Sequence, residues 1–500
     1  MTRKKKRYFL NLSGMAIIIL WLVMMGLLVK KIHFKDKTAG TDGSLVQAVT
    51  IDSYQREWKE IYLKDKKLGY TVSMIKPFDE GYFIQEEIFL KLSLMGHAGG
   101  IYTITQARVD TNFLLENFNF SMASGAVRFN ISGRVEGDHL LVETGKGKGQ
   151  RTQRIKLSGT PMIGAGMGPF FRSRKIRVGQ TFKFPVFDPS TLAQKEVVVK
   201  VVAREPVKIN RRTFDAFRLE TEMWGKIVTL WLDKDGATLK EKGFMGLTAI
   251  KSSAANAPRN IEAGGEIDFY EISAVTVDRA LFRPRQSSYL KLRIYGIDYT
   301  ALDTKAWNGG RQRFHKGIME ITRERPPANA SYSLPYDGYS EEMMPFLEPE
   351  FNIESDDREI IDKALQISGD DNDPSSVAKK LLNWVSRNLE KKPVVSIPSA
   401  LEVLRTRVGD CNEHATLLTA LLRAMKIPAR LSIGLVYSRG KFFYHAWNEA
   451  YTGEWISMDA TMDQMPVDAT HIKLLEGNLD KQVEIAGLIG TLKLKVLDYD

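Results

Sequence analysis

The chain contains a single cysteine, Cys411, and it stands among residues that could carry out covalent chemistry. It lies in the segment 408–415, Val-Gly-Asp-Cys-Asn-Glu-His-Ala, and is followed by the segments 443–449, which contains His445, and 455–461, which contains Asp459. A thiol nucleophile needs a base to take its proton, and the base needs a partner that orients it. These three residues are therefore a candidate nucleophile, base and orienting carboxylate.

The residues after Cys411 have the spacing of an amphipathic helix. Gly409-Asp410 is a turn pair, apolar residues recur at helical intervals up to Met425, and Pro428 marks the end. The thiol is expected at the N-terminus of this helix, where backbone N–H groups and the helix dipole favour a thiolate. The first backbone N–H groups could also hold an oxyanion, whereas no side-chain oxyanion donor is evident.

The two later segments have the pattern of a β-hairpin. Residues 442–451 and 454–460 are strand-like and flank Thr452-Gly453. If the loop is 451–453, His445 and Asp459 stand directly opposite each other on one face, where Cβ atoms are about 4.5–5.5 Å apart. A loop one residue longer or shorter would place them on opposite faces.

Other interpretations of these residues remain open. A lone cysteine is often a small buried apolar side chain. His414, three residues after Cys411, is a rival base, but a residue on the same helix cannot easily reach over the thiol and also meet an orienting group. Asn448 could orient His445, but the alternation of a strand turns it to the other face.

Four segments together resemble successive motifs of the transglutaminase-like superfamily. They are Gly-Asp-Cys-Asn-Glu-His-Ala at 409–415, Ile-Pro-Ala-Arg at 427–430, His-Ala-Trp-Asn-Glu at 445–449 and Met-Asp-Ala-Thr at 458–461. The resemblance covers about the last 150 residues, one domain's worth. It implies a papain-like core with Cys411 as nucleophile, His445 as general base and acid, and Asp459 as orienter. Many relatives carry Asp-Pro-Thr where this chain has Asp-Ala-Thr, a departure confined to a turn.

The amino terminus has the composition of a membrane anchor. Five basic residues at 3–7 precede an apolar run at 8–29, and these 22 residues are enough to span a hydrocarbon core of about 30 Å. The run is too long for a signal peptide, and no small-x-small cleavage site follows. We predict a cytoplasmic basic segment and transmembrane helix at 1–34, a tether at 35–50, and a body on the extracytoplasmic side, periplasmic or extracellular.

Charge and motifs exclude several other functions. The net charge is +11, but residues 1–37 carry nine basic and one acidic side chain, which leaves only +3 for the rest and does not indicate nucleic-acid binding. No P-loop, zinc spacing or dinucleotide fingerprint is present, so no cofactor is expected. Asp370-Asp-Asn-Asp-Pro374 lacks the spaced ligands of a calcium loop and is better explained as a helix cap, so no metal is expected.

The remaining sequence predicts an α+β fold in which antiparallel β-rich domains precede the catalytic core. Residues 51–253 contain short alternating strands, typical of a curved or barrel-like meander, with 161–174 connecting its halves. The strand order resembles the half-barrels of periplasmic lipoprotein carriers, and the domain is either a structural spacer or a holder of lipid or peptide. A smaller β-rich domain is expected at 265–345 and the transglutaminase-like catalytic domain at 350–500.

The resemblance implies acyl transfer from an amide through a thioester at Cys411. Transfer to water would make the protein a membrane-anchored peptidase or amidase, and transfer to an amine would make it a protein-glutamine acyltransferase. The substrate would be a protein or peptide, for instance of the cell envelope. The alternative is a non-catalytic envelope scaffold or binding module, but the intact set of Cys411, His445 and Asp459 favours an enzyme.

Overall fold

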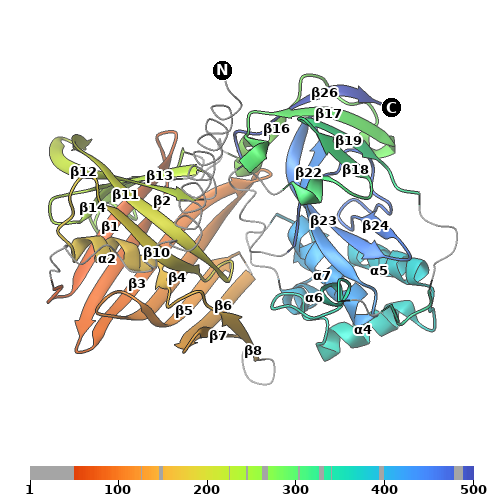
Figure 1. The fold of residues 1–500 in the computed structure, drawn as a ribbon, viewed down its shortest axis with the longest axis horizontal. Coiled ribbons are helices and arrows are strands. Elements are labelled where there is room, and N and C mark those ends of the chain that lie inside the picture. Colours follow the sequence, from red (N-terminus) through yellow and green to blue (C-terminus); the bar gives the residue numbers. More distant parts are fainter. Residues whose placement is uncertain are drawn as a thin grey trace, which may run out of the picture.

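The computed structural model describes residues 50–500 except 126, 146–149, 224–225, 244–245, 262–267, 302–303, 326–331, 339–340, 394–398 and 478–487. These residues form a β-rich lobe and a mixed helical and β lobe, which lie side by side (Figure 1). The transmembrane helix predicted at 8–29 lies outside the described residues. Within the described part, no helix is both long enough and apolar enough to cross a membrane.

The first lobe is one continuous sheet of fifteen strands. Strands β1–β8 form one antiparallel meander and β10–β15 a second, and the pairing of β1 with β15 joins them. The strands are β1 (Gln55–Leu63), β2 (Lys66–Phe78), β3 (Gly81–Leu94), β4 (His97–Asp110), β5 (Leu115–Ser124), β6 (Val127–Glu136), β7 (His139–Thr144), β8 (Arg151–Lys156), β9 (Met162–Ile163), β10 (Thr181–Asp188), β11 (Ala193–Ile209), β12 (Arg212–Met223), β13 (Lys226–Leu232), β14 (Thr238–Lys242) and β15 (Thr248–Ser252).

The alternation of apolar and polar residues explains which face of each strand is buried. In β10, Phe182 and Phe184 are buried, whereas Thr181 before them and Lys183 between them are exposed. Successive side chains of a strand point to opposite faces, so the phenylalanines of β10 share the inner face of the sheet. The tight turn between β6 and β7 uses Gly137 at a φ of 61°, a conformation that glycine adopts without steric cost.

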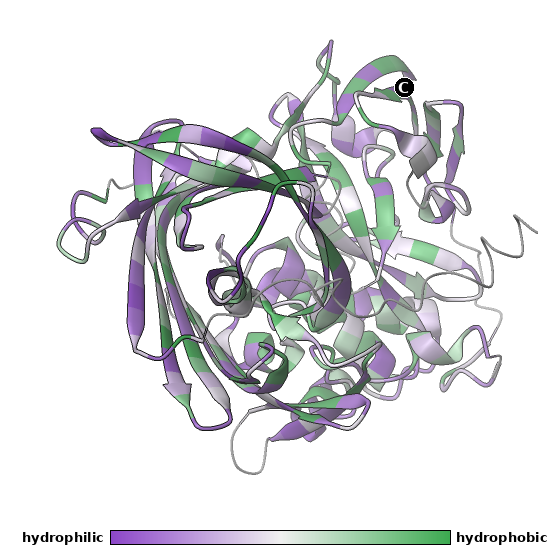
Figure 2. Ribbon diagram, turned by 60° about the vertical axis from the view of Figure 1, so that its left-hand side comes forward, coloured by the Kyte–Doolittle hydropathy of each residue, from purple (hydrophilic) through white to green (hydrophobic). Residues whose placement is uncertain are grey.

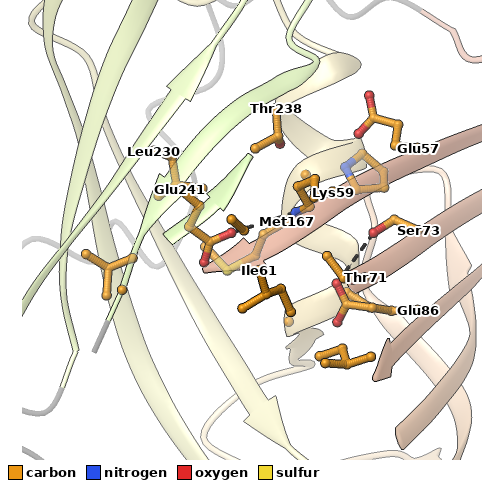
Figure 3. Close-up of a pocket in the computed structure, with 18 of the residues that line it drawn as sticks. Glu57, Lys59, Ile61, Thr71, Ser73, Glu86, Met167, Leu230, Thr238 and Glu241 are labelled. Atoms are coloured by element: carbon orange, nitrogen blue, oxygen red, sulfur yellow. Dashed lines mark hydrogen bonds and ion pairs between the residues drawn. The ribbon is translucent and has the colours of Figure 1, made fainter. Parts of the chain in front are cut away.

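The sheet curves round on itself (Figure 2), and its two halves are antiparallel meanders, as predicted. Residues of its inner face line a hollow. The segment 161–174 connects the two halves, and its helix α2 (Met167–Arg172) lines the hollow together with β1, β2 and β3 (Figure 3). Phe170 and Phe171 of α2 pack edge-on against Phe182 and Phe184 of β10. Such aromatic contacts add to the stabilisation from apolar burial and hold the helix against the sheet.

The second lobe packs four helices against a five-stranded sheet with the order β16-β23-β22-β25, in which β24 also pairs with β23. The elements are α4 (Arg358–Ser368), α5 (Pro374–Asn388), α6 (Ala400–Thr406), α7 (Cys411–Ala424), β16 (Val275–Thr276), β22 (Ala429–Ser438), β23 (Lys441–Tyr451), β24 (Trp455–Met458) and β25 (Ile472–Glu476). Helix α7 is almost completely buried between the other helices and β23, so its position is set by packing on every side.

The local sequence sets both ends of α7. The carboxylate of Asp410 accepts a hydrogen bond from the Asn412 N–H, and the carboxylate of Glu413 accepts one from the Asp410 N–H, which makes a capping box. Gly409 leaves room for the returning side chain, because a Cβ there would lie 2.2 Å from the Cβ of Glu413. The helix ends before Lys426, whose φ is 59°. The helix predicted from Cys411 is therefore present with the expected length.

The β-rich unit predicted at 265–345 is not separate from the last domain. Its sheet has the order β18-β19-β17-β26, so a strand from the carboxyl terminus completes it. In addition, β16 pairs with β23 and so belongs to the sheet of the second lobe. The bounds are β17 (Tyr289–Tyr295), β18 (Gln312–His315), β19 (Ile318–Thr322) and β26 (Lys493–Tyr499), and two short parallel strands are β20 (Glu390–Lys391) and β21 (Val408–Gly409).

A short helix, α3 (Phe269–Ser273), connects the two lobes. Its Phe269 and Ile272 pack against leucines of the first lobe, among them Leu90 of β3. Its Tyr270 stacks on Phe443 of β23, with ring centroids 4.2 Å apart. The same helix therefore contacts the wall of the hollow and the strand that carries His445.

Candidate active site

The sheet of the second lobe has a gap in one edge, and Cys411 lies at this gap. Strand β22 pairs with β23 from residue 441 to residue 450. On the opposite edge of β23, β16 pairs only with 441–442 and β24 only with 448–451. The N-terminus of α7 meets the stretch between them, where the backbone N–H of Ala446 donates a hydrogen bond to the Cys411 sulfur.

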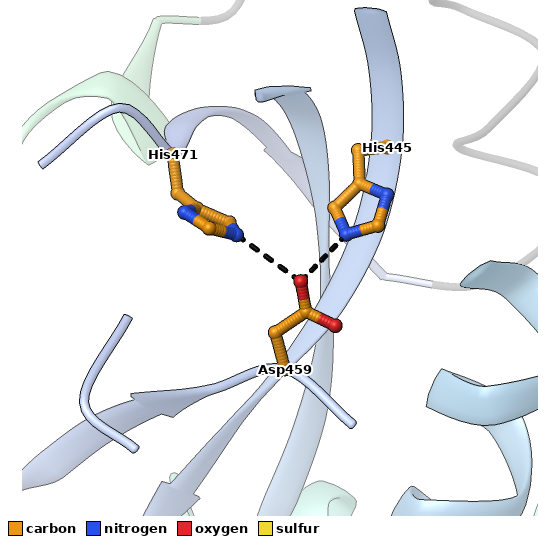
Figure 4. Close-up of side chains that lie close together, drawn as sticks. All are labelled: His445, Asp459 and His471. Atoms are coloured by element: carbon orange, nitrogen blue, oxygen red, sulfur yellow. Dashed lines mark hydrogen bonds and ion pairs between the residues drawn. The ribbon is translucent and has the colours of Figure 1, made fainter. Parts of the chain in front are cut away.

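His445, the residue before that backbone amide, is hydrogen-bonded to Asp459. Its Nε2 lies 2.8 Å from Oδ2 of the carboxylate (Figure 4). Both side chains are buried, with 7% and 1% of their surface exposed. When Nε2–H donates to Asp459, Nδ1 is the ring nitrogen left for a proton from the thiol. The structure thus brings all three predicted site residues to the N-terminal end of α7.

The register of the hairpin differs from the predicted one. Ala450 pairs with Ile456 and Glu449 pairs with Ser457, so the loop is 452–454 and not 451–453. The predicted direct pairing of His445 with Asp459 is therefore wrong, since this register places Asp459 level with position 447, two residues after His445 along β23. The loop still has an odd length, which keeps both residues on one face as diagonal neighbours within reach of each other.

A second histidine, which the sequence did not indicate, contacts the same carboxylate. Nε2 of His471 lies 3.2 Å from Oδ2 of Asp459, and Nδ1 lies 3.5 Å from Oδ1 of Asp468. His471 comes directly before β25, whose pairing with β22 brings it to the site. The chain from Asp459 to His471 is irregular, so no periodic spacing predicts this contact. The one available signal is the pair Asp468 and His471 themselves, three residues apart.

Electrostatics keep the shared carboxylate ionised. Burial would raise the pKa of Asp459, but His445 and then His471 hold this pKa well below its usual range. Burial would lower the pKa of His471, but Asp459 and Asp468 outweigh burial and raise it. The pKa of Asp468 is in turn lowered by His471 and by Arg285, whose Nη1 lies 2.8 Å from Oδ2. Asp459 therefore accepts hydrogen bonds from two imidazoles at once.

The same three groups could be taken for a metal site, because ligand atoms of His445, Asp459 and His471 lie within 4.8 Å of one another. Ligand atoms bound to Zn²⁺ at about 2.0–2.1 Å in a tetrahedron stand roughly 3.3 Å apart. The 2.8 Å between Nε2 of His445 and Oδ2 of Asp459 is shorter and has the length of a hydrogen bond. The arrangement fits a network of shared protons better than a metal centre.

The environment of Cys411 opposes the expectation that its helix position favours a thiolate. Burial first, and then the nearby Asp410, raise the pKa of the thiol well above its usual value, while the Ala446 N–H lowers it. The pKa of Asp410 is itself raised well above its usual value by burial and by Glu413. The raised pKa of the thiol means that Cys411 is protonated at rest until a base removes its proton.

The structure assigns the two rival residues to other contacts. Nδ1 of His414 lies 2.6 Å from the carbonyl oxygen of Asp410, so this nitrogen is the donor. Burial also lowers the pKa of His414. Nδ2 of Asn448 donates to the carbonyl of Ala415 at 2.8 Å and to Oγ1 of Thr419 at 2.7 Å. Asn448 thus faces α7, on the side of the strand predicted for it, and does not orient His445.

The second lobe contains a transglutaminase-like domain. Residues 361–460 match the transglutaminase-like superfamily, a span that includes Cys411, His445 and Asp459 but ends before His471. The resemblance predicted from the motifs is confirmed. Residues 119–242 of the first lobe match DUF3108, a family of proteins of unknown function. Among curated protein sequences, none matches this chain.

Several solved structures are similar to parts of the chain. One is a protein from Cytophaga hutchinsonii described as a candidate cysteine protease. It is 18% identical, and the match covers 43% of this chain and 87% of that protein, with a TM-score of 0.28. A β-barrel-like DUF1849 protein from Brucella abortus is 13% identical over 41% of this chain and 98% of its own, with a TM-score of 0.31. A candidate protease from Parabacteroides distasonis is 12% identical over 69% of each chain, with a TM-score of 0.19. At TM-scores this low, none of the three establishes a shared fold.

The raised pKa of His471 gives a prediction about stability. A histidine whose pKa is higher in the folded state stabilises that state below its unfolded pKa of about 6.5, and the contribution is lost as the pH rises through the folded pKa. His471→Gln should therefore lower the free energy of unfolding by about 1.5–3 kcal/mol near pH 6, as expected for charge-assisted hydrogen bonds, and by less at alkaline pH. Urea unfolding across this range measures the difference.

His414→Gln is the matched control for this prediction, because burial lowers the pKa of His414. Its loss of stability should grow as the pH rises, which is the opposite trend. A deficit of the His471 variant that does not change with pH would contradict the proposed charge on that imidazole.

Proposed function

We propose that this chain is a membrane-anchored cysteine enzyme that acts on amide bonds through a thioester at Cys411. The observation that carries the proposal is the contact of Cys411, at the start of the buried helix α7, with the backbone beside His445, whose ring is bonded to the buried Asp459. The transglutaminase-like match over 361–460 supports the same assignment. Proteins or peptides of the cell envelope are the substrates that fit this chemistry and the predicted location.

In the first half-reaction, His445 takes the proton of the Cys411 thiol and the sulfur attacks the carbonyl carbon of the amide. The tetrahedral intermediate collapses, the carbon–nitrogen bond breaks, and His445 returns the proton to the leaving amine. The products are a thioester on Cys411 and a free amine. Asp459 holds the imidazole in one orientation and stabilises the imidazolium that forms between the two transfers.

In the second half-reaction, an acceptor attacks the thioester carbonyl while His445 takes its proton. The carbon–sulfur bond then breaks and the thiol regains a proton from the imidazolium. Water as acceptor gives a carboxylic acid, whereas an amine gives a new amide. We favour hydrolysis because water needs no binding site of its own.

The role of His471 is to fix the carboxylate that orients His445. Since Oδ2 of Asp459 lies 2.8 Å from one imidazole and 3.2 Å from the other, the carboxylate cannot rotate without losing both contacts. His471 does not touch the reacting atoms in this scheme and acts through Asp459. A fixed carboxylate keeps Nδ1 of His445 directed at the thiol, which general base catalysis requires.

The covalent role of Cys411 can be tested with a peptide digest of a bacterial proteome as acyl donors, in H₂¹⁸O and with a biotinylated alkylamine. Wild-type chain should place ¹⁸O in newly formed carboxyl groups. Cys411→Ala should lower the rate of ¹⁸O incorporation by at least about a thousandfold, and Asp459→Asn should lower it by about a hundredfold or more. Mass spectrometry of the peptides measures both products.

Incorporation of the amine in place of ¹⁸O would identify an acyltransferase. No turnover by wild type, together with protein partners that remain bound to Cys411→Ala, would contradict the enzyme and favour the scaffold. Thermal unfolding of each variant shows whether a loss of turnover has a structural cause.

The membrane anchor is the part of the proposal that rests on sequence alone, on the basic segment 3–7 and the apolar run 8–29. The full chain should remain in the membrane fraction after alkaline carbonate washing, and a chain beginning at residue 38 should not. Protease added to spheroplasts should degrade the body and spare an N-terminal tag. A body that stays protected in intact spheroplasts would contradict the extracytoplasmic location.

A further inference from the structure

The hollow of the first lobe encloses a cavity that the proposed chemistry does not use. Its volume is about 440 Å³, and it is formed by the inner faces of β1, β2, β3 and β12–β15 and by helix α2 (Figure 3). Small-molecule sites in proteins have volumes of roughly 300–1,000 Å³, so the cavity is large enough for a ligand.

One part of the cavity wall is aliphatic. Ile61 of β1, Ile88 and Leu90 of β3 and Leu230 of β13 line it, and each of these side chains keeps part of its surface accessible. Inward-facing aliphatic side chains in a filled core would be fully covered. An apolar ligand group that covered them would gain about 25 cal/mol for each Å² removed from water.

The polar part of the wall follows from strand register. Glu57 of β1 pairs with Ser73 of β2, which pairs with Glu86 of β3, and these three line the cavity in one row. The next row on the same face begins with Lys59 and Thr71. Alternation therefore places two acids, a lysine and two hydroxyl groups on the inner face, within a few ångströms of the aliphatic residues.

The charges on this wall do not balance. Glu57 forms an ion pair with Arg172 of α2, and Lys59 lies 3.7 Å from Glu241 of β14. Glu86 is left over, because no lysine or arginine among the described residues forms an ion pair with it. Three carboxylates thus face two cations in the lining.

Few hydrogen bonds or charges offset the cost of burying the Glu86 carboxyl group inside the lobe. Among the described residues, Glu86 accepts a side-chain hydrogen bond only from the Ser73 hydroxyl, at 3.5 Å, the limit for such a bond. Burial raises the pKa of Glu86, and the positive charge of Lys59 offsets only part of this. A carboxyl group in this position is poorly solvated and would gain from a cation.

Two hydroxyl groups in the lining add a second, independent signal. Thr71 and Thr221 are 5% and 4% exposed, and their Oγ1 atoms have no hydrogen-bond partner in the part of the chain that the structure describes. Both residues line the cavity. Buried polar groups are normally hydrogen-bonded, so unpartnered ones on a cavity wall mark a place where a ligand would supply the partner.

We propose that the cavity binds a single-chain amphiphile with an ammonium head group. The alkyl chain lies against Ile61, Ile88, Leu90 and Leu230, and the ammonium group donates to Glu86 and to the nearby hydroxyl oxygens. The inference is independent of the chemistry at Cys411.

The choice of an ammonium group follows from the lining. An ammonium offers three hydrogen-bond donors and no acceptor, which matches a surplus carboxylate beside hydroxyl oxygens. Its charge also balances the lining. A carboxylate head group would instead place a further anion beside Glu86 and Glu241, which is unfavourable in a poorly solvated site.

The test uses the full-length chain and three photoreactive probes that share one diazirine-bearing alkyl chain and differ in an ammonium, hydroxyl or carboxylate head group. After irradiation, mass spectrometry locates the labelled residues. The ammonium probe should label the inner-face residues of β2, β3 and β13 at least about tenfold more than the carboxylate probe, a difference of about 1.4 kcal/mol. Excess unlabelled alkylamine should abolish this labelling.

Glu86→Gln should remove the preference for the ammonium probe and leave labelling by the hydroxyl probe unchanged. Glu87→Gln is the matched control, because Glu87 is the next residue of β3, does not line the cavity and accepts a hydrogen bond from Tyr102 at 2.8 Å. Equal labelling by all three head groups, labelling that excess amine does not displace, or an unchanged preference in Glu86→Gln would each overturn the proposal. Equal thermal unfolding of the two variants excludes misfolding as the cause.

Discussion

The position of the candidate nucleophile depends on a buried contact between helix α7 and strand β23. The Asn448 amide donates two hydrogen bonds to the helix, to Ala415 and Thr419, and Asn448 and Thr419 are both fully buried. Buried amides are costly when unpaired, so this contact allows one axial position of the helix on the strand. In that position the first residue of the helix, Cys411, reaches the gap between β16 and β24. The strand thus anchors the helix with one face and presents His445 with the other.

The charged side chains around the thiol lie in two sets, one on the helix and one on the sheet. On the helix side, Asp410 and Glu413 cap α7, and burial together with the nearby Asp410 raises the pKa of the thiol, which disfavours a thiolate. On the sheet side, Asp459 is ionised and accepts hydrogen bonds from two histidines. The ionised Asp459 therefore places a negative charge beside the ring of His445, 2.8 Å from its Nε2. In the proposed mechanism Cys411 therefore needs His445 as its base, because the place of the thiol at a helix N-terminus does not by itself make it a thiolate.

Features set by local chemistry could be predicted from the sequence, and features set by distant pairing could not. The start of α7 follows from Asp410 and Glu413, and the parity of the hairpin follows from an odd loop. The predicted register of the hairpin was wrong, because the loop is formed by Thr452, Gly453 and Glu454. The sequence does not select between this loop and another of the same odd length.

Contacts that join remote segments could not be predicted from local patterns. His471 reaches Asp459 only because β25 pairs with β22, and β26 completes a sheet that begins about two hundred residues earlier, with β17. In the first lobe, alternation predicted an inner face but not which acids would lack a cation. The surplus at Glu86 appears only when β1, β2, β3, β14 and α2 are assembled, because the partners of Glu57 and Lys59 come from other parts of the chain.

The most direct test of the central claim is the rate at which iodoacetamide alkylates Cys411 around pH 7, followed by mass in the full-length chain. The chain has one cysteine, so the rate reports that thiol alone. If His445 is the base, wild type should react at least about a hundredfold faster than His445→Ala, with His414→Ala close to wild type. Equal rates for wild type and His445→Ala would show that the thiol has no base there, and would contradict the assignment of a catalytic cysteine.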